Sequence, residues 1–134
     1  RRQRQMCIRD RRESKFAWAE LLRRQDRRAD AVKLYKELAS DVRTKEGSAA
    51  AYYVLEDVFA GGDMDKAEKA IFAYSEREPQ AYWLAKAFIL LGDVYVRKGD
   101  NFQARATYQS VADGYSPADD GIVAEAKERI AKLN

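Results

Sequence analysis

The feature that most constrains this chain is an internal repeat in its second half. Residues 62–74 and 99–111 share a Gly-Asp pair, an alanine, and then two apolar residues at helical spacings of four and three. The aligned residues, 37 positions apart, are Gly62-Asp63 with Gly99-Asp100, Ala67 with Ala104, Ile71 with Tyr108, and Tyr74 with Val111. A repeat of this length predicts stacked helical units, because one unit cannot bury its apolar faces without a neighbour.

The last copy also carries a recognisable first helix, Phe88-x-x-Leu91-Gly92-x-x-Tyr95, directly before its turn. We expect Gly92 and Ala104 to be small so that the two helices of the unit approach closely. Tyr95 and Tyr108 are expected to fill the space between one helix pair and the next. The last copy spans residues 82–117 and contains a short insertion.

The other copies are less regular. The middle copy covers residues 48–81, has Leu55 at the glycine position and Val58 at the tyrosine position, and closes on Pro79. A degenerate copy is predicted at residues 12–45 from the residues Trp18, Ala19, Leu22, Ala31, Tyr35 and Leu38. Its turn lacks Gly-Asp and is assigned to Arg27, Arg28 and Asp30. About three units are therefore predicted.

Both ends of the stack need closing. Residues 118–134 predict a capping helix with Asp119 or Asp120 as its N-cap. Its apolar stripe is Ile122, Ala126, Ile130 and Leu133, and the charged residues Glu125, Lys127, Glu128, Arg129 and Lys132 are expected to face away. Residues 1–11 form a basic segment that we interpret as the remnant of a preceding helix. Tyr82 and Trp83, in the insertion, are expected to lengthen their helix and pack on Phe72 or its neighbours.

Residues 82–95 and 97–107 resemble the C-terminal repeats of large bacterial tetratricopeptide repeat (TPR) proteins. The resemblance implies an all-α, helix-turn-helix TPR-like solenoid with a C-terminal capping helix, forming a single domain over residues 1–134. It also implies a protein–protein interaction scaffold, such as an assembly factor, that binds a protein or peptide. Several such proteins are attached to the cell envelope, so a periplasmic association is implied by resemblance, while the sequence itself assigns no compartment.

In this architecture the first helix of each unit lines the concave face, where partners bind. Ten residues are nominated there: Phe16, Glu20, Arg23, Tyr52, Glu56, Phe59, Lys86, Ile89, Asp93 and Arg97. Tyrosine and arginine are favoured in protein interfaces because they combine a large contact area with a polar tip. The alternative for Phe59 and Ile89 is that they only pack against the adjacent helix.

Related domains in chaperone cofactors grip a peptide carboxylate with Lys and Asn at set concave positions. At the matching positions of this chain only Lys86 has that chemistry, so a two-carboxylate clamp is not expected. The concave face is instead predicted to be mixed aromatic and acidic.

Charge is distributed unevenly, and this supports an alternative function. Residues 1–47 carry 15 Lys and Arg against 8 Asp and Glu, whereas the remainder carries 10 against 14. The arginine-rich front could contact nucleic acid or an anionic surface. Acidic residues interrupt this basic field, and aromatic residues for base stacking are missing from the first fifteen positions. We therefore prefer the interpretation that these arginines only solvate the exposed faces of long helices.

Enzymatic chemistry is not expected. The chain has no histidine and one cysteine, Cys7, which leaves no zinc-type spacing and no imidazole to activate a thiol. Glu56 and Asp93, expected on one inner face, are the nearest approach to a catalytic pair, and we interpret them as selecting a basic partner. No metal, cofactor or membrane-spanning segment is predicted. Because the chain begins with Arg1 rather than Met, it is open whether it is a piece of a longer repeat protein, and self-association stays an alternative.

Overall fold

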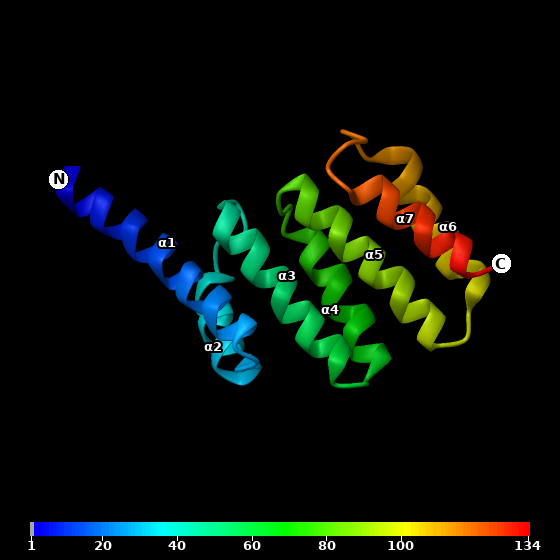
Figure 1. The fold of residues 1–134 in the computed structure, drawn as a ribbon, viewed down its shortest axis with the longest axis horizontal. Helices are drawn as coiled ribbons and strands as arrows, with labels where there is room; N and C mark the ends of the chain where they lie inside the picture. Colours follow the sequence, from blue (N-terminus) through cyan, green and yellow to red (C-terminus); the bar gives the residue numbers. More distant parts are fainter. Residues whose placement is uncertain (1) are drawn as a thin grey trace.

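The computed structural model describes the backbone of residues 2–134 and the side chains of residues 8–134. The described chain folds into seven helices and no strands (Figure 1). The helices are α1 (Arg2–Arg24), α2 (Arg28–Leu38), α3 (Lys45–Ala60), α4 (Met64–Glu76), α5 (Ala81–Arg97), α6 (Asn101–Gly114) and α7 (Ile122–Lys132). The all-α prediction is confirmed.

The helices form an elongated stack of three hairpins followed by α7, with the two termini at opposite ends (Figure 1). We refer to α1–α2, α3–α4 and α5–α6 as units 1, 2 and 3. Along residues 2–134, α1, α3, α5 and α7 each contact the next of this series, whereas α2, α4 and α6 do not contact one another. The first series is therefore an inner layer, and α2, α4 and α6 form an outer layer.

The same turn joins the two helices of every unit. Gly62 and Gly99 adopt the left-handed conformation, with φ of 92° and 82°, and Asp26 holds the equivalent place with φ of 63°. Asp63 and Asp100 cap the following helices by accepting from backbone N–H groups, whereas Arg27 makes no side-chain cap. The turn of unit 1 is thus residues 25–27. Placing it at residues 27–30 was wrong, since α2 has already begun at Arg28.

The aligned apolar residues occupy one position in all three units. Five residues after the left-handed turn residue stands an alanine, and four residues later a large side chain, all no more than 1% exposed: Ala31 and Tyr35, Ala67 and Ile71, Ala104 and Tyr108. Small and large residues alternate along each second helix, so the helix packs closely against its partners. The weakest copy in the sequence thus occupies the same places as the strongest.

Gly92 is small for a different reason from the one predicted. A Cβ at Gly92 would lie 2.3 Å from the Tyr108 ring, which is 1% exposed. The glycine therefore makes room for an aromatic ring rather than for a neighbouring backbone. At the same place unit 2 has Leu55, and the ring is replaced by Ile71. A larger residue on the first helix is matched by a smaller one on the second.

Two predictions about the ends are corrected. Residues 2–24 form one continuous helix, so residues 1–11 are not the remnant of a separate one. The last helix begins at Ile122, and its N-cap is Gly121 rather than Asp119 or Asp120. Asp120 still supports the helix start, because its carboxylate accepts from the Ile122 N–H at 3.2 Å. The left-handed φ of Gly121, 92°, makes the sharp entry that a β-carbon would strain.

Candidate functional site

Three acidic residues repeat along the inner layer. Glu20, Glu56 and Asp93 each stand six residues before the left-handed turn residue of their unit. Each carboxylate accepts a hydrogen bond from a tyrosine hydroxyl: Tyr35 donates to Glu20, Tyr52 to Glu56, and Tyr108 to Asp93. The repeat therefore places one oriented carboxylate per unit on the inner face, a pattern that spacing alone had shown only in part.

Two of these carboxylates are also paired with arginine. Arg23 lies 3.0 Å from Glu20, and Arg129 of α7 lies 3.1 Å from Asp93. Within residues 8–134, the carboxylate of Glu56 has no ion-pair partner. Among the described residues, the central carboxylate of the row is thus the one whose charge no cation of the chain neutralises.

The ionisation of this row is set by burial and hydrogen bonding. Desolvation opposes the charge on Glu20, but hydrogen bonds from Arg23 and Tyr35 outweigh it and lower its pKa. Burial, together with the nearby Glu56 charge, raises the pKa of Tyr52 far above its ordinary value. The tyrosine hydroxyls therefore stay protonated and act as donors.

Aromatic rings form a continuous row across α1, α2, α3 and α5. Starting from Phe16, the row passes through Tyr35 and Tyr53 to Trp83, with centroid separations of 6.1, 5.0 and 5.6 Å. Tyr82 extends it at 5.0 Å from Trp83. Tyr82 and Trp83 lengthen α5 as predicted, since the helix begins at Ala81. Trp83 contacts Tyr53 of α3 and packs against the cluster that includes Ile71 and Tyr74, neighbours of Phe72 on α4.

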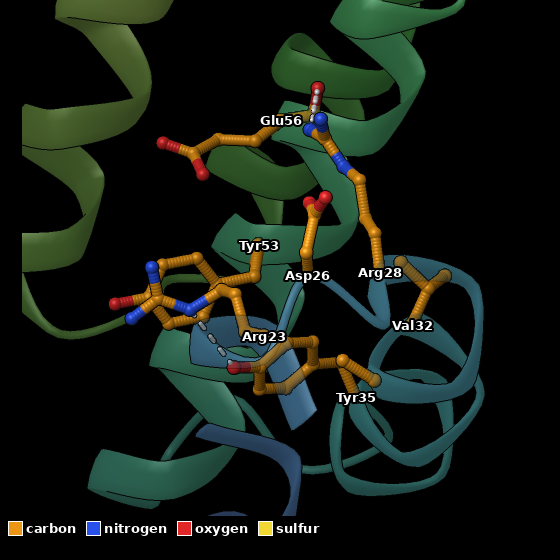
Figure 2. Close-up of a pocket in the computed structure, with 8 residues that line it drawn as sticks. Arg23, Asp26, Arg28, Val32, Tyr35, Tyr53 and Glu56 are labelled. Atoms are coloured by element: carbon orange, nitrogen blue, oxygen red, sulfur yellow. Dashed lines mark hydrogen bonds between the residues drawn. The ribbon is translucent and has the colours of Figure 1, made fainter. Parts of the chain in front are cut away.

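A cleft of about 220 Å³ opens between units 1 and 2 beside this row (Figure 2). Figure 2 shows the Arg23 guanidinium lying across the Tyr53 ring, 4.5 Å from its centroid. Asp26 and Glu56 line the same cleft, together with Arg28, which is bound to the backbone of Glu56 and to Asp57. The cleft thus offers an aromatic wall and two carboxylates, while its arginines are held by groups of the protein itself.

The ten nominated residues divide by accessibility. Eight are half-buried or exposed: Phe16, Glu20, Arg23, Glu56, Phe59, Lys86, Asp93 and Arg97. Ile89 is 2% exposed and packs against Ala104 and Tyr108, so it belongs to the core, as its alternative interpretation stated. Tyr52 is 5% exposed and supports the surface from beneath through its bond to Glu56.

Sequence reasoning missed four contributors to the inner face. Tyr53 and Trp83 complete the aromatic row, and the Tyr52-Tyr53 pair beside an aromatic insertion was the available signal. Glu125 and Arg129 were expected to face away from the stack. Both point to it: Glu125 lies 3.7 Å from Lys86, and Arg129 binds Asp93. The last helix therefore extends the inner face as well as closing the core.

The inner face also holds two cation–aromatic contacts. Lys86 lies 5.6 Å from the Tyr52 ring centroid, and Arg97 lies 5.0 Å from that of Phe59. Lys86 also pairs with Glu125 of α7, 3.7 Å away. Cation–aromatic contacts hold long side chains in place, so they order this surface.

Most arginines of residues 8–47 are bound to carboxylates of the protein. Arg9 pairs with Glu13, Arg12 with Glu46, Arg27 with Asp30, and Arg43 with Asp41. The side chains of Arg1, Arg2, Arg4 and Cys7 lie outside the described residues. These pairs reduce the positive field that the composition of the front half suggested, and so weaken the argument for phosphate binding.

Comparison with known proteins gives no relative: no family model, no curated protein and no solved structure matches the chain. Among the described residues, no group of three or more acidic, histidine or cysteine side chains is placed to hold a metal ion. None of the described helices has the length and apolar character needed to cross a membrane.

Proposed function

We propose that this chain is a protein–protein interaction scaffold of tetratricopeptide type, which binds a peptide segment of a partner along its inner face. The observation that supports this most strongly is the set of half-buried rings of Phe16, Tyr53 and Trp83 near the unneutralised carboxylate of Glu56. Flat apolar rings give contact area at little entropic cost, and a half-buried carboxylate binds a positive charge favourably. The segment bound is one that presents a lysine or arginine beside an apolar or aromatic residue.

Geometry supports this choice of charge. The carboxylates of Glu20 and Asp93 are already paired with arginine, so a cation gains most at Glu56, between them. Asp26 lines the same cleft as Glu56, so an incoming cation meets two carboxylate acceptors there, while the Tyr53 ring already carries the Arg23 guanidinium. An anionic segment would instead bring its charge beside these carboxylates.

A library of short random peptides displayed on phage tests the proposal without knowledge of the natural partner. Selection on the intact chain should enrich peptides with a basic residue next to an aromatic one. Their affinity should fall about tenfold or more for Trp83→Ala and for Glu56→Gln. Glu76→Gln removes the same charge from the exposed end of α4, in the outer layer, and should change nothing.

The same assay separates the alternative function. A labelled single-stranded oligonucleotide that binds more tightly than any selected peptide, and that is released steeply by salt, would place the function on the arginine-rich front instead. Peptide enrichment that ignores both inner-face substitutions would also contradict the proposal. Folding of each variant is checked by its helical circular dichroism.

A further inference from the structure

The outward face of α1 is an apolar surface that nothing covers in the described part of the chain. Trp18 is 53% exposed and Leu21 is 42% exposed, and Ser14 and Ala17 beside them are also exposed. We call Ser14, Ala17, Trp18 and Leu21 the α1 seam. Two large apolar side chains on one helix face, flanked by small ones, form the kind of surface into which another helix packs.

The repeat itself shows what kind of element fits the seam. In unit 3 the equivalent residues, at the same distances before the turn, are Ala87, Leu90, Leu91 and Val94, and all are 6% exposed or less. They are buried against the preceding unit, chiefly Ala67, Ile71 and Tyr74 of α4. In unit 2 Ala50, the counterpart of Ser14, is likewise fully buried against the unit before it. The preceding unit therefore buries all four counterparts in unit 3, whereas in unit 2 it buries Ala50 fully and Tyr53 and Val54 partly, and the side chain of Asp57, the counterpart of Leu21, is 41% exposed.

The charges around the α1 seam indicate which kind of helix would bind there. Residues 8–24 carry six basic and three acidic side chains, and four of the basic ones, Arg9, Arg12, Lys15 and Arg23, are paired within the chain. Beside the seam, Ile8, Arg11, Arg12, Lys15 and Leu38 line a hollow of about 180 Å³. Arg12 and Lys15 are bound to Glu46 and Glu37, whereas Arg11 has no ion-pair partner within residues 8–134. A second copy of α1 would bring like charges together, so an acidic flank is favoured.

We infer that the α1 seam binds an amphipathic helix of a partner protein, with its apolar face on Trp18 and Leu21 and an acidic side chain beside Arg11. This surface is separate from the inner face, because the seam residues do not belong to the aromatic row or to its cleft. The inference therefore stands whether or not the inner face binds a peptide. It gives the scaffold a second contact at its N-terminal end.

Two synthetic helical peptides test the inference by fluorescence anisotropy on the intact chain. Both repeat the Ala-Ile-Tyr face of α4, and one has glutamates and the other lysines along its flanks. The glutamate peptide should bind at least about tenfold more tightly than the lysine peptide. Trp18→Ser with Leu21→Ser should weaken it about tenfold or more. Phe102→Ser, which removes an 83% exposed aromatic from α6, is the matched control and should bind within about twofold.

Arg11→Glu provides a variant that leaves the apolar seam intact. It should narrow or reverse the preference for the glutamate peptide. Equal binding of the two peptides, or binding that ignores the Trp18 and Leu21 substitutions, would overturn the inference. Sedimentation of the wild-type chain as a dimer that these substitutions dissolve would overturn it too, since the occupant would then be a second copy.

Discussion

Units 1 and 3 have the same construction and different surroundings. In unit 3 the turn is Gly99-Asp100 with a capped second helix, and both sides of its first helix are buried by neighbours. In unit 1 Asp26 adopts the left-handed turn conformation, Arg27 gives no cap, and α1 has one uncovered side. The comparison shows that the packing of the second helix defines the unit, while the turn residues only tune its stability.

The core also differs between units, because a larger side chain on the first helix is matched by a smaller one on the second. Unit 3 pairs Gly92 with Tyr108, whereas unit 2 pairs Leu55 with Ile71 at the same places. Gly92→Leu in unit 3 should therefore cost more than about 3 kcal/mol of unfolding free energy, because the buried ring cannot move aside. Urea denaturation followed by circular dichroism measures this, as the largest of the effects expected here.

A second substitution decides whether volume exchange is the reason. Gly92→Leu combined with Tyr108→Ile reproduces the unit 2 pair and should recover a large part of the loss, a coupling that a double-mutant cycle measures. Gly114→Ala is the control, because a β-carbon there meets nothing within 4 Å. If the double variant is no more stable than Gly92→Leu alone, the two units are not interchangeable in this way.

The tyrosine–carboxylate bond is the feature that units 1 and 3 share most closely. Tyr35→Phe and Tyr108→Phe each remove a hydroxyl that donates to a partly buried carboxylate, and each should cost about 1–2 kcal/mol. Similar losses from both would confirm that these bonds are equivalent. If Tyr35→Phe alone left the free energy of unfolding unchanged, the stability of unit 1 would not depend on the Tyr35–Glu20 hydrogen bond.

The turn of unit 1 can be converted into that of unit 3. Asp26→Gly relieves the left-handed strain, and Arg27→Asp adds the missing N-cap, so the double change should raise the free energy of unfolding by about 1 kcal/mol or slightly more. Thermal unfolding measures the gain. Gly62→Ala, at a φ of 92°, is the reciprocal change and should destabilise unit 2. If Asp26→Gly destabilises the fold, the Asp26 carboxylate makes a contact that contributes more free energy than the left-handed strain costs.

The smallest expected effect is a change in acid stability. The folded-state pKa of Glu20 is lowered from 4.5, so its ionised form stabilises the fold above that pH, and this contribution is lost as the pH falls below it. Glu20→Gln should reduce stability at neutral pH and flatten the acid side of the stability curve. Urea midpoints on both sides of pH 4.5 would reveal this. An acid limb as steep as that of the wild type would assign the pH dependence to other carboxylates.

The stack of helical units was predictable because the Ala-x-x-x-Tyr spacing marks the buried side of each second helix. This held even in unit 1, whose turn at Asp26 lacks the Gly-Asp pair. Glu56 and Asp93 were predicted on the inner face, because the period of the α-helix places both residues on that side of their helices. The positions of Trp83 and Arg129 were not predictable, because each depends on which neighbouring helix it meets. Ile89 was misplaced because a residue at the border of the inner face turns toward α6 and α7 once they are packed.

The most direct test of the central claim uses the two tryptophans of the chain, one beside the inner face and one in the α1 seam. Their indole N–H signals are followed by ¹⁵N–¹H NMR during titration with a basic-aromatic peptide selected on the intact chain. Binding along the inner face predicts that the Trp83 signal shifts in a saturable way while that of Trp18 stays in place. A saturable shift at Trp18 alone, or at neither signal, would contradict the assignment of the binding surface to the inner face.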